Sequence, residues 1–328
     1  MRLETTLVVG GGAWGTALAQ AAGMAGRGVT LLVRDAAQAE EINSAHTNGR
    51  YLGEQVLLPG LRAVMTAEPA DFVIMAVPAQ ATRAALRGLD PALLAGKPVV
   101  LSAKGLEAGS LQRQSEVLLE VAPEAVPFVL SGPSFAADVA AGRPTAVTLA
   151  GDDAGDSSAL AAALAGPHFR PYAADDRIGV EVAGALKNIY ALACGAVEGA
   201  GLGLSARSAL IARAYAEMSR LVVGMGGSTR TLTGLAGLGD LCLTCTSPQS
   251  RNYLFGIALG QGRTVAEIMG AGAKLAEGVA TTPVAAALAR RLGVDAPLVD
   301  AVDKVLNQHA GIEDVVAGLM SRPLKRED

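Results

Sequence analysis

Three glycines near the start of the chain, Gly10, Gly12 and Gly15, have the spacing of a phosphate-binding turn. An apolar triplet precedes them and an alanine-rich stretch follows, which is the pattern of a strand, a tight turn and a helix. The first glycine permits the bend, the second lets the backbone approach a pyrophosphate, and the third lets the helix pack close to the strand. The helix N-terminus adds free N–H groups and the positive end of its dipole. The motif predicts a dinucleotide site, and the alternative is a glycine-rich turn without a ligand.

A charged pair, Arg34 and Asp35, follows the second expected strand, Val29–Val33. At about this distance from the glycine turn, an acidic side chain holds the ribose 2′-hydroxyl of NAD, whereas an arginine accepts the 2′-phosphate of NADP. Successive residues after a strand tend to point apart. We therefore expect Arg34 to face the cofactor and Asp35 to face away, so that NADPH serves at least as well as NADH. The alternative for Arg34 is a solvated loop charge.

A lysine in the second half of the chain has unusual surroundings. Lys187 lies in the apolar helical stretch Val182–Cys194, in which the neighbouring Asn188 is polar. A lysine buried there without a partner is costly, and burial lowers its pKa and suits it to proton transfer near neutral pH. The alternative is a lysine that extends its ammonium group to the surface. The surroundings alone favour neither reading.

Two further groups lie in the second half of the chain. Asp240 follows a glycine-rich stretch, where backbone can approach a ligand closely, and we expect it to pair with Lys187 or to accept a substrate hydroxyl. Taken alone, an aspartate in this position is more often a helix cap. Ser250, Arg251 and Asn252 begin a helical run, and a helix N-terminus with an arginine fork forms a good phosphate site.

Polar residues also follow two strands of the first half. Lys104 comes after one strand, and Ser131–Ser134, which contains Gly132, comes after another. In a doubly wound sheet, the carboxyl ends of the strands line the ligand crevice. Lys104 is therefore expected to point towards the reaction site rather than to bulk solvent.

The elements that must position these residues divide the chain into two parts. The first half contains continuous apolar runs, typical of parallel strands covered on both faces, with helical stretches between several of them. After about Asp175 only helical patterns of Ala, Leu, Val and Glu follow, over Gly179–Val197, Ser205–Val223, Arg251–Gly260, Pro283–Leu292 and Pro297–Asn307. We expect an α/β fold: an N-terminal doubly wound sheet over residues 1–175 and an all-helical domain over residues 176–328. The expected strands are Leu7–Val9, Val29–Val33, Phe72–Val77, Val99–Ala103, Phe128–Ser131, Ala146–Ala150 and Phe169–Tyr172.

Composition narrows the class of protein further. The net charge is −4 with both signs mixed along the chain, so nucleic acid is not an expected partner. There is no signal peptide pattern, and apolar stretches are broken by glycines or charges, so no membrane span is expected. Three cysteines suit a reducing cytoplasm. Cys242-x-x-Cys245 lacks a second ligand pair, so we interpret both as buried thiols and expect no metal.

Taken together, these residues make the chain similar to the bacterial NAD(P)-dependent glycerol-3-phosphate dehydrogenases along nearly its whole length. No single motif carries this resemblance. It rests on six motifs that have the same order and spacing as in that family. The motifs are Gly10–Ala19, Lys104–Glu107, Ser131–Ala136, Ala185–Asn188, Ala236–Asp240 and Gln249–Asn252.

The resemblance implies a Rossmann-type domain joined to a helical domain, a homodimer, and reduction of dihydroxyacetone phosphate to sn-glycerol 3-phosphate by NADH or NADPH for phospholipid synthesis. It implies that Lys187 is the catalytic proton donor and acceptor. The substrate-contacting positions it implies are Lys104, Gly132, Ser134, Lys187, Asp240, Ser250, Arg251 and Asn252. The cofactor-contacting positions, beyond the three glycines, are Ala13, Trp14, Arg34, Lys104, Ala136, Arg251, Leu275 and Glu277.

Two other functions fit part of the sequence. Other reductases with a helical-domain lysine, such as β-hydroxyacid dehydrogenases and ketopantoate reductases, share the layout, but the phosphate site at Ser250–Asn252 argues against them. A non-catalytic NAD(P) sensor would need the glycine turn but neither Lys187 nor Asp240. Reaction rates with a panel of substrates would distinguish the first alternative. Cofactor binding without any turnover would favour the second.

Overall fold

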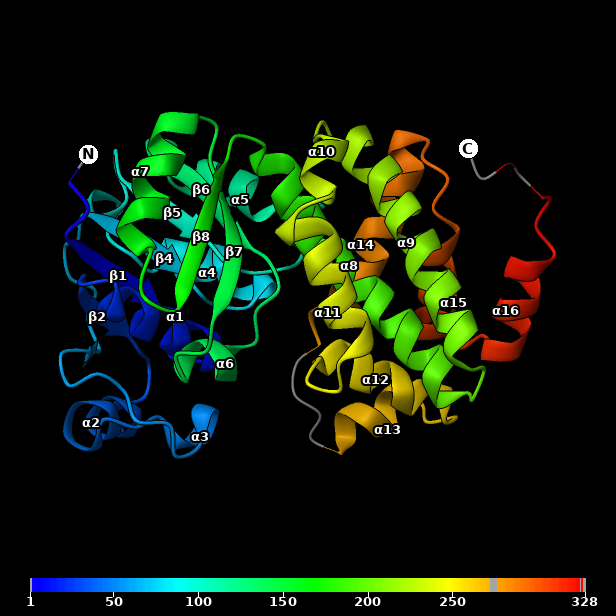
Figure 1. Cartoon of the computed structure of the whole chain (residues 1–328), viewed down its shortest axis with the longest axis horizontal. Coiled ribbons are helices and arrows are strands. Elements are labelled where there is room, and N and C mark those ends of the chain that lie inside the picture. The colour runs from blue at the N-terminus through cyan, green and yellow to red at the C-terminus, as the bar shows by residue number, and fades with distance from the viewer. Residues whose placement is uncertain (1, 272–275, 325, 327–328) are drawn as a thin grey trace.

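The computed structural model describes residues 2–271, 276–324 and 326. A domain built on a β-sheet and a domain built of helices lie side by side (Figure 1). The sheet domain ends with its last strand, and the helical domain begins with the long helix α8 (Arg177–Gly199).

Within the described residues, one sheet of eight strands has the order β3-β2-β1-β4-β5-β6-β7-β8. The strands are β1 (Thr5–Val9), β2 (Gly28–Leu32), β3 (Arg62–Val64), β4 (Phe72–Met75), β5 (Pro98–Leu101), β6 (Val126–Ser131), β7 (Thr145–Ala150) and β8 (Phe169–Ala174). The central strands β4 and β5 are buried along their whole length. This burial explains their unbroken apolar sequences, because helices cover both faces.

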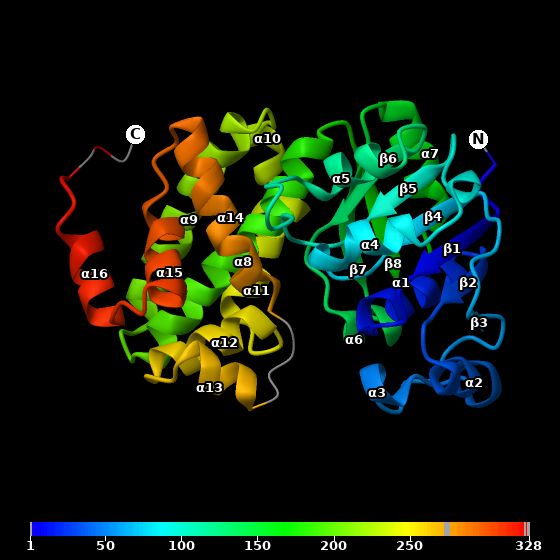
Figure 2. The same cartoon turned by 180° about the vertical axis from the view of Figure 1, so that it is seen from behind.

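The helices of the sheet domain lie on both of its faces. One apolar core joins the sheet to α1, α2, α6 and α7, and a second joins it to α4, α5 and the first turns of α8. Figure 2 shows the face that carries α4. The bounds are α1 (Ala13–Met24), α2 (Ala36–Ala45), α3 (Gly49–Leu52), α4 (Thr82–Arg87), α5 (Gln114–Val121), α6 (Ala136–Ala140) and α7 (Ala154–Leu164), with single 3-10 turns at Ala79–Ala81 and Pro91–Leu93.

One pairing differs from the expected parallel sheet, because β7 runs antiparallel to β6. The chain between them makes the short helix α6, which stays at the carboxyl edge of the sheet and packs on α1. It does not cross the sheet, so β7 must return in the opposite direction. The three-residue strand β3 was not expected, because it is too short to give a periodic signal.

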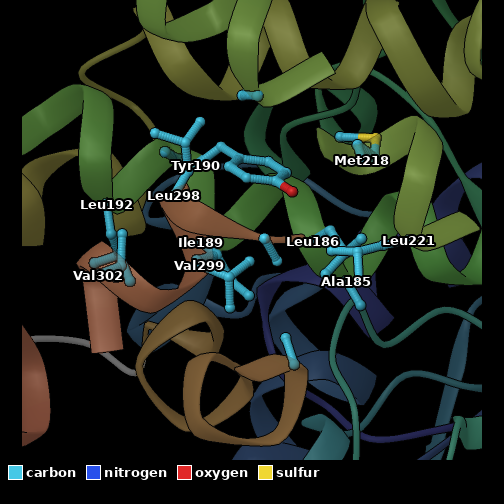
Figure 3. Packing of buried hydrophobic residues seen from close by; sticks show 14 of the residues in the cluster. Ala185, Leu186, Ile189, Tyr190, Leu192, Met218, Leu221, Leu298, Val299 and Val302 are labelled. Carbon is cyan, nitrogen blue, oxygen red and sulfur yellow. The ribbon is translucent and has the colours of Figure 1, made fainter. Parts of the chain in front are cut away.

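The helical domain surrounds α8. Residues of α8 pack against α9, α11, α12 and α14, and the fully buried Tyr190 lies in this core among Leu186, Met218 and Leu298 (Figure 3). The remaining helices are α9 (Leu204–Gly224), α10 (Thr229–Leu232), α11 (Asp240–Thr246), α12 (Arg251–Gly260), α13 (Val265–Gly270), α14 (Glu277–Leu292), α15 (Pro297–Asn307) and α16 (Ile312–Met320), with a π-helical turn at Leu235–Gly239.

Glycines bring α8 and α12 into backbone contact. A Cβ at Gly195 or Gly199 of α8 would collide with backbone oxygens of α12, and a Cβ at Gly256 or Gly260 of α12 would collide with backbone oxygens of α8. The two helices therefore pack closer than any larger side chains would allow. Since α8 carries Lys187 and α12 begins at Arg251, this packing sets the distance between two expected site residues.

Helix α8 is also long and apolar enough to cross a membrane by length and composition. However, 89% of its most apolar window is buried inside the protein, which is the environment of a core helix.

One expectation about side chains was wrong: Cys194 and Cys245 are buried, but Cys242 is exposed. Helix α11 turns Leu241, Thr244 and Cys245 inwards, and this leaves Cys242 on its outer face.

Candidate active site

The glycine turn at the start of α1 has the geometry of a diphosphate cradle. Gly10 has φ of 113°, which a side chain rarely adopts, and a Cβ at Gly15 would collide with the Gly10 carbonyl. No atom of residues 2–271, 276–324 or 326 lies within 4 Å of where a Cβ of Gly12 would stand. Gly12 caps α1 without a side-chain bond, and the first turn, which begins at Ala13, contains no acidic residue. The N–H groups at this end therefore suit an anionic ligand, so the turn fits a dinucleotide.

Two amide side chains hold this turn from outside. Gln38 of α2 donates to the Gly11 carbonyl at 2.5 Å, and the fully buried Asn48 donates to the same oxygen at 3.1 Å. Asn48 also donates to the hydroxyl of Thr16 at 2.8 Å. These bonds fix the loop through contacts within the protein, which lowers the entropy cost of binding a ligand. Neither amide was a candidate from the sequence, because nothing in their spacing distinguishes them.

Side chains beside the turn have features that suit the rest of a dinucleotide. The indole N–H of Trp14 is buried and has no hydrogen-bond partner among the described residues, while the Lys104 ammonium lies 6.0 Å from the Trp14 ring centre. Ala136 begins α6 and is half-buried. Arg34 is exposed, and the Asp35 carboxylate accepts the Ala37 N–H at 2.9 Å as the cap of α2. Asp35 is therefore engaged with its own helix.

Lys187 lies in a cluster of charges at the boundary between the two domains. Its ammonium group forms an ion pair with Asp240 and donates to the Thr244 hydroxyl at 2.8 Å. The other oxygen of Asp240 accepts from the Lys104 ammonium at 2.8 Å. The side chain of Asp240 is fully buried, and that of Lys187 is 7% exposed. One carboxylate from the helical domain thus joins a lysine of each domain.

The charges in this cluster set the protonation of its members. Burial, and next the Lys104 charge, lower the pKa of Lys187 to about 8, although Asp240 opposes the shift. Burial alone would raise the pKa of Asp240, but the two ammonium groups outweigh it and hold that pKa below its usual value. Lys187 can therefore give or take a proton near neutral pH while Asp240 stays ionised.

The carboxyl end of β6 lies beside this cluster. Lys104 donates to the Gly132 carbonyl at 2.9 Å, and the Ser134 hydroxyl donates to the same oxygen at 2.9 Å. Gly132 has φ of 146°, and a Cβ there would press on Val147. The Ser131 hydroxyl is buried, and no hydrogen-bond partner for it lies in the described part of the chain. The structure thus brings Lys104, Gly132, Ser134, Lys187 and Asp240 together.

The N-terminus of α12 contributes the remaining polar residues. Ser250 caps α12 by accepting the Tyr253 N–H at 3.2 Å. Asn252 is buried and donates to the Asn188 side chain at 2.9 Å. Arg251 is exposed, so its guanidinium group is accessible to an anion at this helix end.

Glu277 begins α14 and joins the two domains. Its carboxylate accepts the N–H of Ala79 at 3.0 Å and the N–H of Lys104 at 3.2 Å. Glu277 was expected to contact the cofactor, and it lies where the strands β4 and β5 have ended. Leu275, also expected at the cofactor, lies outside the described residues.

Sequence reasoning missed Thr244 and the contact made by Asn188. Asn188 donates to the Lys104 carbonyl at 2.7 Å, across the domain boundary. Thr244 lies one helical turn after Asp240 on α11, and that four-residue spacing was the available signal. The partner of Asn188 depends on how the domains meet, which no local pattern encodes.

Comparison with known proteins agrees with this geometry. A family model described as the N-terminus of NAD-dependent glycerol-3-phosphate dehydrogenase matches residues 5–156, and the model of its C-terminus matches residues 176–317. The chain is 48% identical over 330 residues to the glycerol-3-phosphate dehydrogenase (NAD(P)+) of Caulobacter vibrioides, covering 100% of both. It is 51% identical to the enzyme of that name from Methylobacterium radiotolerans, covering 100% of this chain and 99% of the relative.

A solved structure extends the likeness to three dimensions. The crystal structure of glycerol-3-phosphate dehydrogenase from Coxiella burnetii superposes with a TM-score of 0.91 at 37% identity, covering 97% of this chain and 99% of that one. The family models cover both domains, and the relatives align along their whole length. The chain therefore belongs to the NAD-dependent glycerol-3-phosphate dehydrogenase family.

Proposed function

We propose that the protein reduces dihydroxyacetone phosphate to sn-glycerol 3-phosphate, reversibly, with NADH or NADPH. The observation that carries this proposal is the buried cluster in which Asp240 joins Lys187 of the helical domain to Lys104 of the sheet domain. The cluster lies at the carboxyl edge of the sheet, where doubly wound folds bind their ligands. The glycine turn at the start of α1 lies at the same edge and fits a diphosphate.

The residues of this chain provide the proton and the charge for the reaction. A bound NADH or NADPH supplies the hydride to C2 of the ketone. Negative charge then develops on the C2 oxygen, and the ammonium group of Lys187 stabilises this charge and donates the proton. Asp240 and Thr244 hold that ammonium group in place. Lys104 adds a second positive charge, and Arg251 with the N-terminus of α12 binds the phosphate.

Initial rates test the function directly. We expect reduction of dihydroxyacetone phosphate with both cofactors, measured in parallel, and poor reduction of unphosphorylated dihydroxyacetone. Arg251→Ala should raise the KM for the phosphate ester by about 10- to 150-fold, since a charge-assisted bond contributes about 1.5–3 kcal/mol. Equal kcat/KM for the two ketones in the unchanged protein would contradict a phosphate site. Turnover of hydroxy acids or ketopantoate instead would favour the related reductases.

Further parts of the proposal concern the setting of the reaction. We propose that the site residues named above act in the roles that the resemblance implies, and that the domains divide at 175/176. The protein is proposed to act as a cytoplasmic homodimer that supplies glycerophospholipid synthesis. Light scattering would test the dimer, which has twice the chain mass of 33.0 kDa.

A further inference from the structure

Besides Asp240 of α11, a second buried carboxylate lies on α8, and it has no part in the chemistry described so far. Glu181 lies on the same helix as Lys187 and is 4% exposed. It lies where the first turns of α8 enter the core of the sheet domain, next to Val180. A carboxylate in such a place is costly unless it is bonded, so its bonds need an explanation.

The partner of Glu181 is the first turn of α5. One carboxylate oxygen accepts the Ser115 N–H at 2.8 Å, and the other accepts the Ser115 hydroxyl at 2.6 Å. Burial raises the pKa of Glu181, while the two bonds from Ser115 and the charges of Arg113 and Arg177 oppose the shift. The positive end of the α5 dipole also favours a carboxylate here. Glu181 therefore binds α8 of one domain to α5 of the other.

The same turn of α5 holds the loop that carries Lys104. The buried side chain of Gln114 donates to the Gly105 carbonyl at 3.0 Å. From the other side, Asn188 of α8 donates to the Lys104 carbonyl at 2.7 Å. The loop is thus bonded to α8 twice, once directly and once through α5 and Glu181. A Cβ on Gly184 of α8 would come within 2.6 Å of the Ser131 hydroxyl, so the helix also packs tightly against β6.

We propose that Glu181 is a positioning residue for the reaction: by binding the first turn of α5, it holds the Lys104 loop against α8 and so keeps Lys104 close to Asp240 and Lys187. Glu181 touches neither ligand nor reacting atom. The inference rests on the proposed function, because it concerns the lysine that donates the proton.

The proposal has a signature that a purely stabilising role lacks. The charge of Lys104 is one of the causes that lower the pKa of Lys187, together with burial and against Asp240. If the loop moves away, the pKa of Lys187 rises. A direct loss of the Glu181 charge would act in the opposite direction, since removing a negative charge lowers the pKa of an ammonium group. The direction of the shift therefore separates positioning from direct electrostatics.

The test compares four variants of the full chain with the unchanged protein. Glu181→Met removes both bonds, and Ser115→Ala removes only the hydroxyl bond. Glu181→Gln retains an acceptor for the Ser115 N–H and can donate to the hydroxyl, so it serves as the conservative variant. Glu217→Met is the matched control, because Glu217 is also a buried carboxylate bonded to the start of a helix. It accepts the N–H groups of Leu298 and Val299 at 2.8 and 2.9 Å, within the helical domain.

The measurements are kcat for reduction of dihydroxyacetone phosphate against pH, and the Tm of each protein. We expect Glu181→Met to lower kcat about ten-fold and to move the high-pH fall in rate upwards by about half a pH unit. Ser115→Ala should shift the high-pH fall in kcat less than Glu181→Met does. Glu181→Gln and Glu217→Met should leave that fall at the pH of the unchanged protein. Glu217→Met should still lower the Tm.

Other outcomes would overturn the inference. A Glu181→Met protein with a lowered Tm but an unmoved pH profile would show a stabilising role alone; if that variant does not fold, an unmoved profile and unchanged kcat in Ser115→Ala would show the same. An equal downward shift of the high-pH fall in Glu181→Gln and Glu181→Met would assign the effect to the lost charge. If the unchanged protein does not reduce dihydroxyacetone phosphate at all, the proposed function itself fails, and the inference with it.

Discussion

Lys187 and Lys104 share one carboxylate, and this sharing sets the chemistry available at the site. Burial lowers the pKa of Lys187 to about 8, and Asp240, which is shared with Lys104, raises that pKa too little to offset the shift. Near that value an amine is a competent acid in one direction and a competent base in the other. An isolated ion pair between Lys187 and Asp240 would instead hold the proton more tightly.

The first prediction concerns this lysine. Lys187→Ala should lower kcat by about 10²- to 10⁴-fold, the usual contribution of a positioned acid. Trp14 is the single tryptophan and lies in the glycine turn, so quenching of its fluorescence reports cofactor binding, which should persist in the variant. In the unchanged protein, ketone reduction should fall as pH rises through about 8 and alcohol oxidation should rise. A kcat within about threefold of the unchanged protein would contradict the role.

The second prediction concerns cofactor choice. The Asp35 side chain caps α2, whereas Arg34 is exposed. Arg34→Ala should weaken NADPH binding by about 1.5–3 kcal/mol and NADH binding much less, because only NADPH loses a charge-assisted bond. Dissociation constants from Trp14 quenching, measured for both cofactors on both proteins, check this. An equal penalty for NADH would mean that Arg34 does not bind the 2′-phosphate, and a strong preference of the unchanged protein for NADH would point to Asp35.

At the scale of elements, α8 connects nearly every part of the site. It carries Lys187 and Asn188, contacts α11 with Asp240, and packs through glycines on α12, which begins at Arg251. The distance between the proposed proton donor and the proposed phosphate anchor therefore depends on the glycines at this crossing. Small residues at a helix crossing are sensitive to any added volume.

The third prediction tests this crossing. Gly256→Ala should destabilise the protein by about 1–3 kcal/mol, because its Cβ would collide with the Leu192 carbonyl of α8. The same change at Gly318 of α16 meets no described atom within 4 Å and should stabilise by about 0.5–1 kcal/mol through helix propensity alone. Denaturant unfolding of both variants measures the difference. Two variants that both stabilise the protein would show that the crossing tolerates a wider separation.

The sequence predicted the elements well where a pattern was long. Helices α12 and α15 have the expected bounds, and seven expected strands exist with ends shifted by a few residues. Helix α14 was expected to start at Pro283 but begins earlier, at Glu277. Pro283 lies inside the helix rather than at its first position. The direction of β7 and the exposure of Cys242 depend on tertiary packing, which periodicity does not report.

At the scale of the whole molecule, the contacts across the domain boundary could not be predicted. Glu277, Asn188 and Glu181 each bond backbone or hydroxyl groups of the sheet domain from the helical domain. No local pattern identifies the partner of any of the three, since that partner lies far away in the chain. The candidate site residues could be proposed from the sequence because glycine spacing and an isolated lysine carry chemical information without the fold. The fold then determines which of these residues contact one another.

The last prediction concerns the stability of the whole chain against pH. Glu217 of α9 is buried, accepts the N–H groups of Leu298 and Val299, and lies beside Tyr190 and Arg220; burial raises its pKa to about 7. A carboxyl whose folded pKa is raised contributes stability that is fully present below its unfolded pKa and is lost as pH rises through about 7. Glu217→Gln cannot titrate, so the free energy of unfolding of the unchanged protein minus that of the variant should fall by about 2–3 kcal/mol between pH 4.5 and 8. Urea unfolding at several pH values measures this difference. A difference that grows with pH would mean that the helix N-terminus of α15 outweighs burial and holds Glu217 ionised.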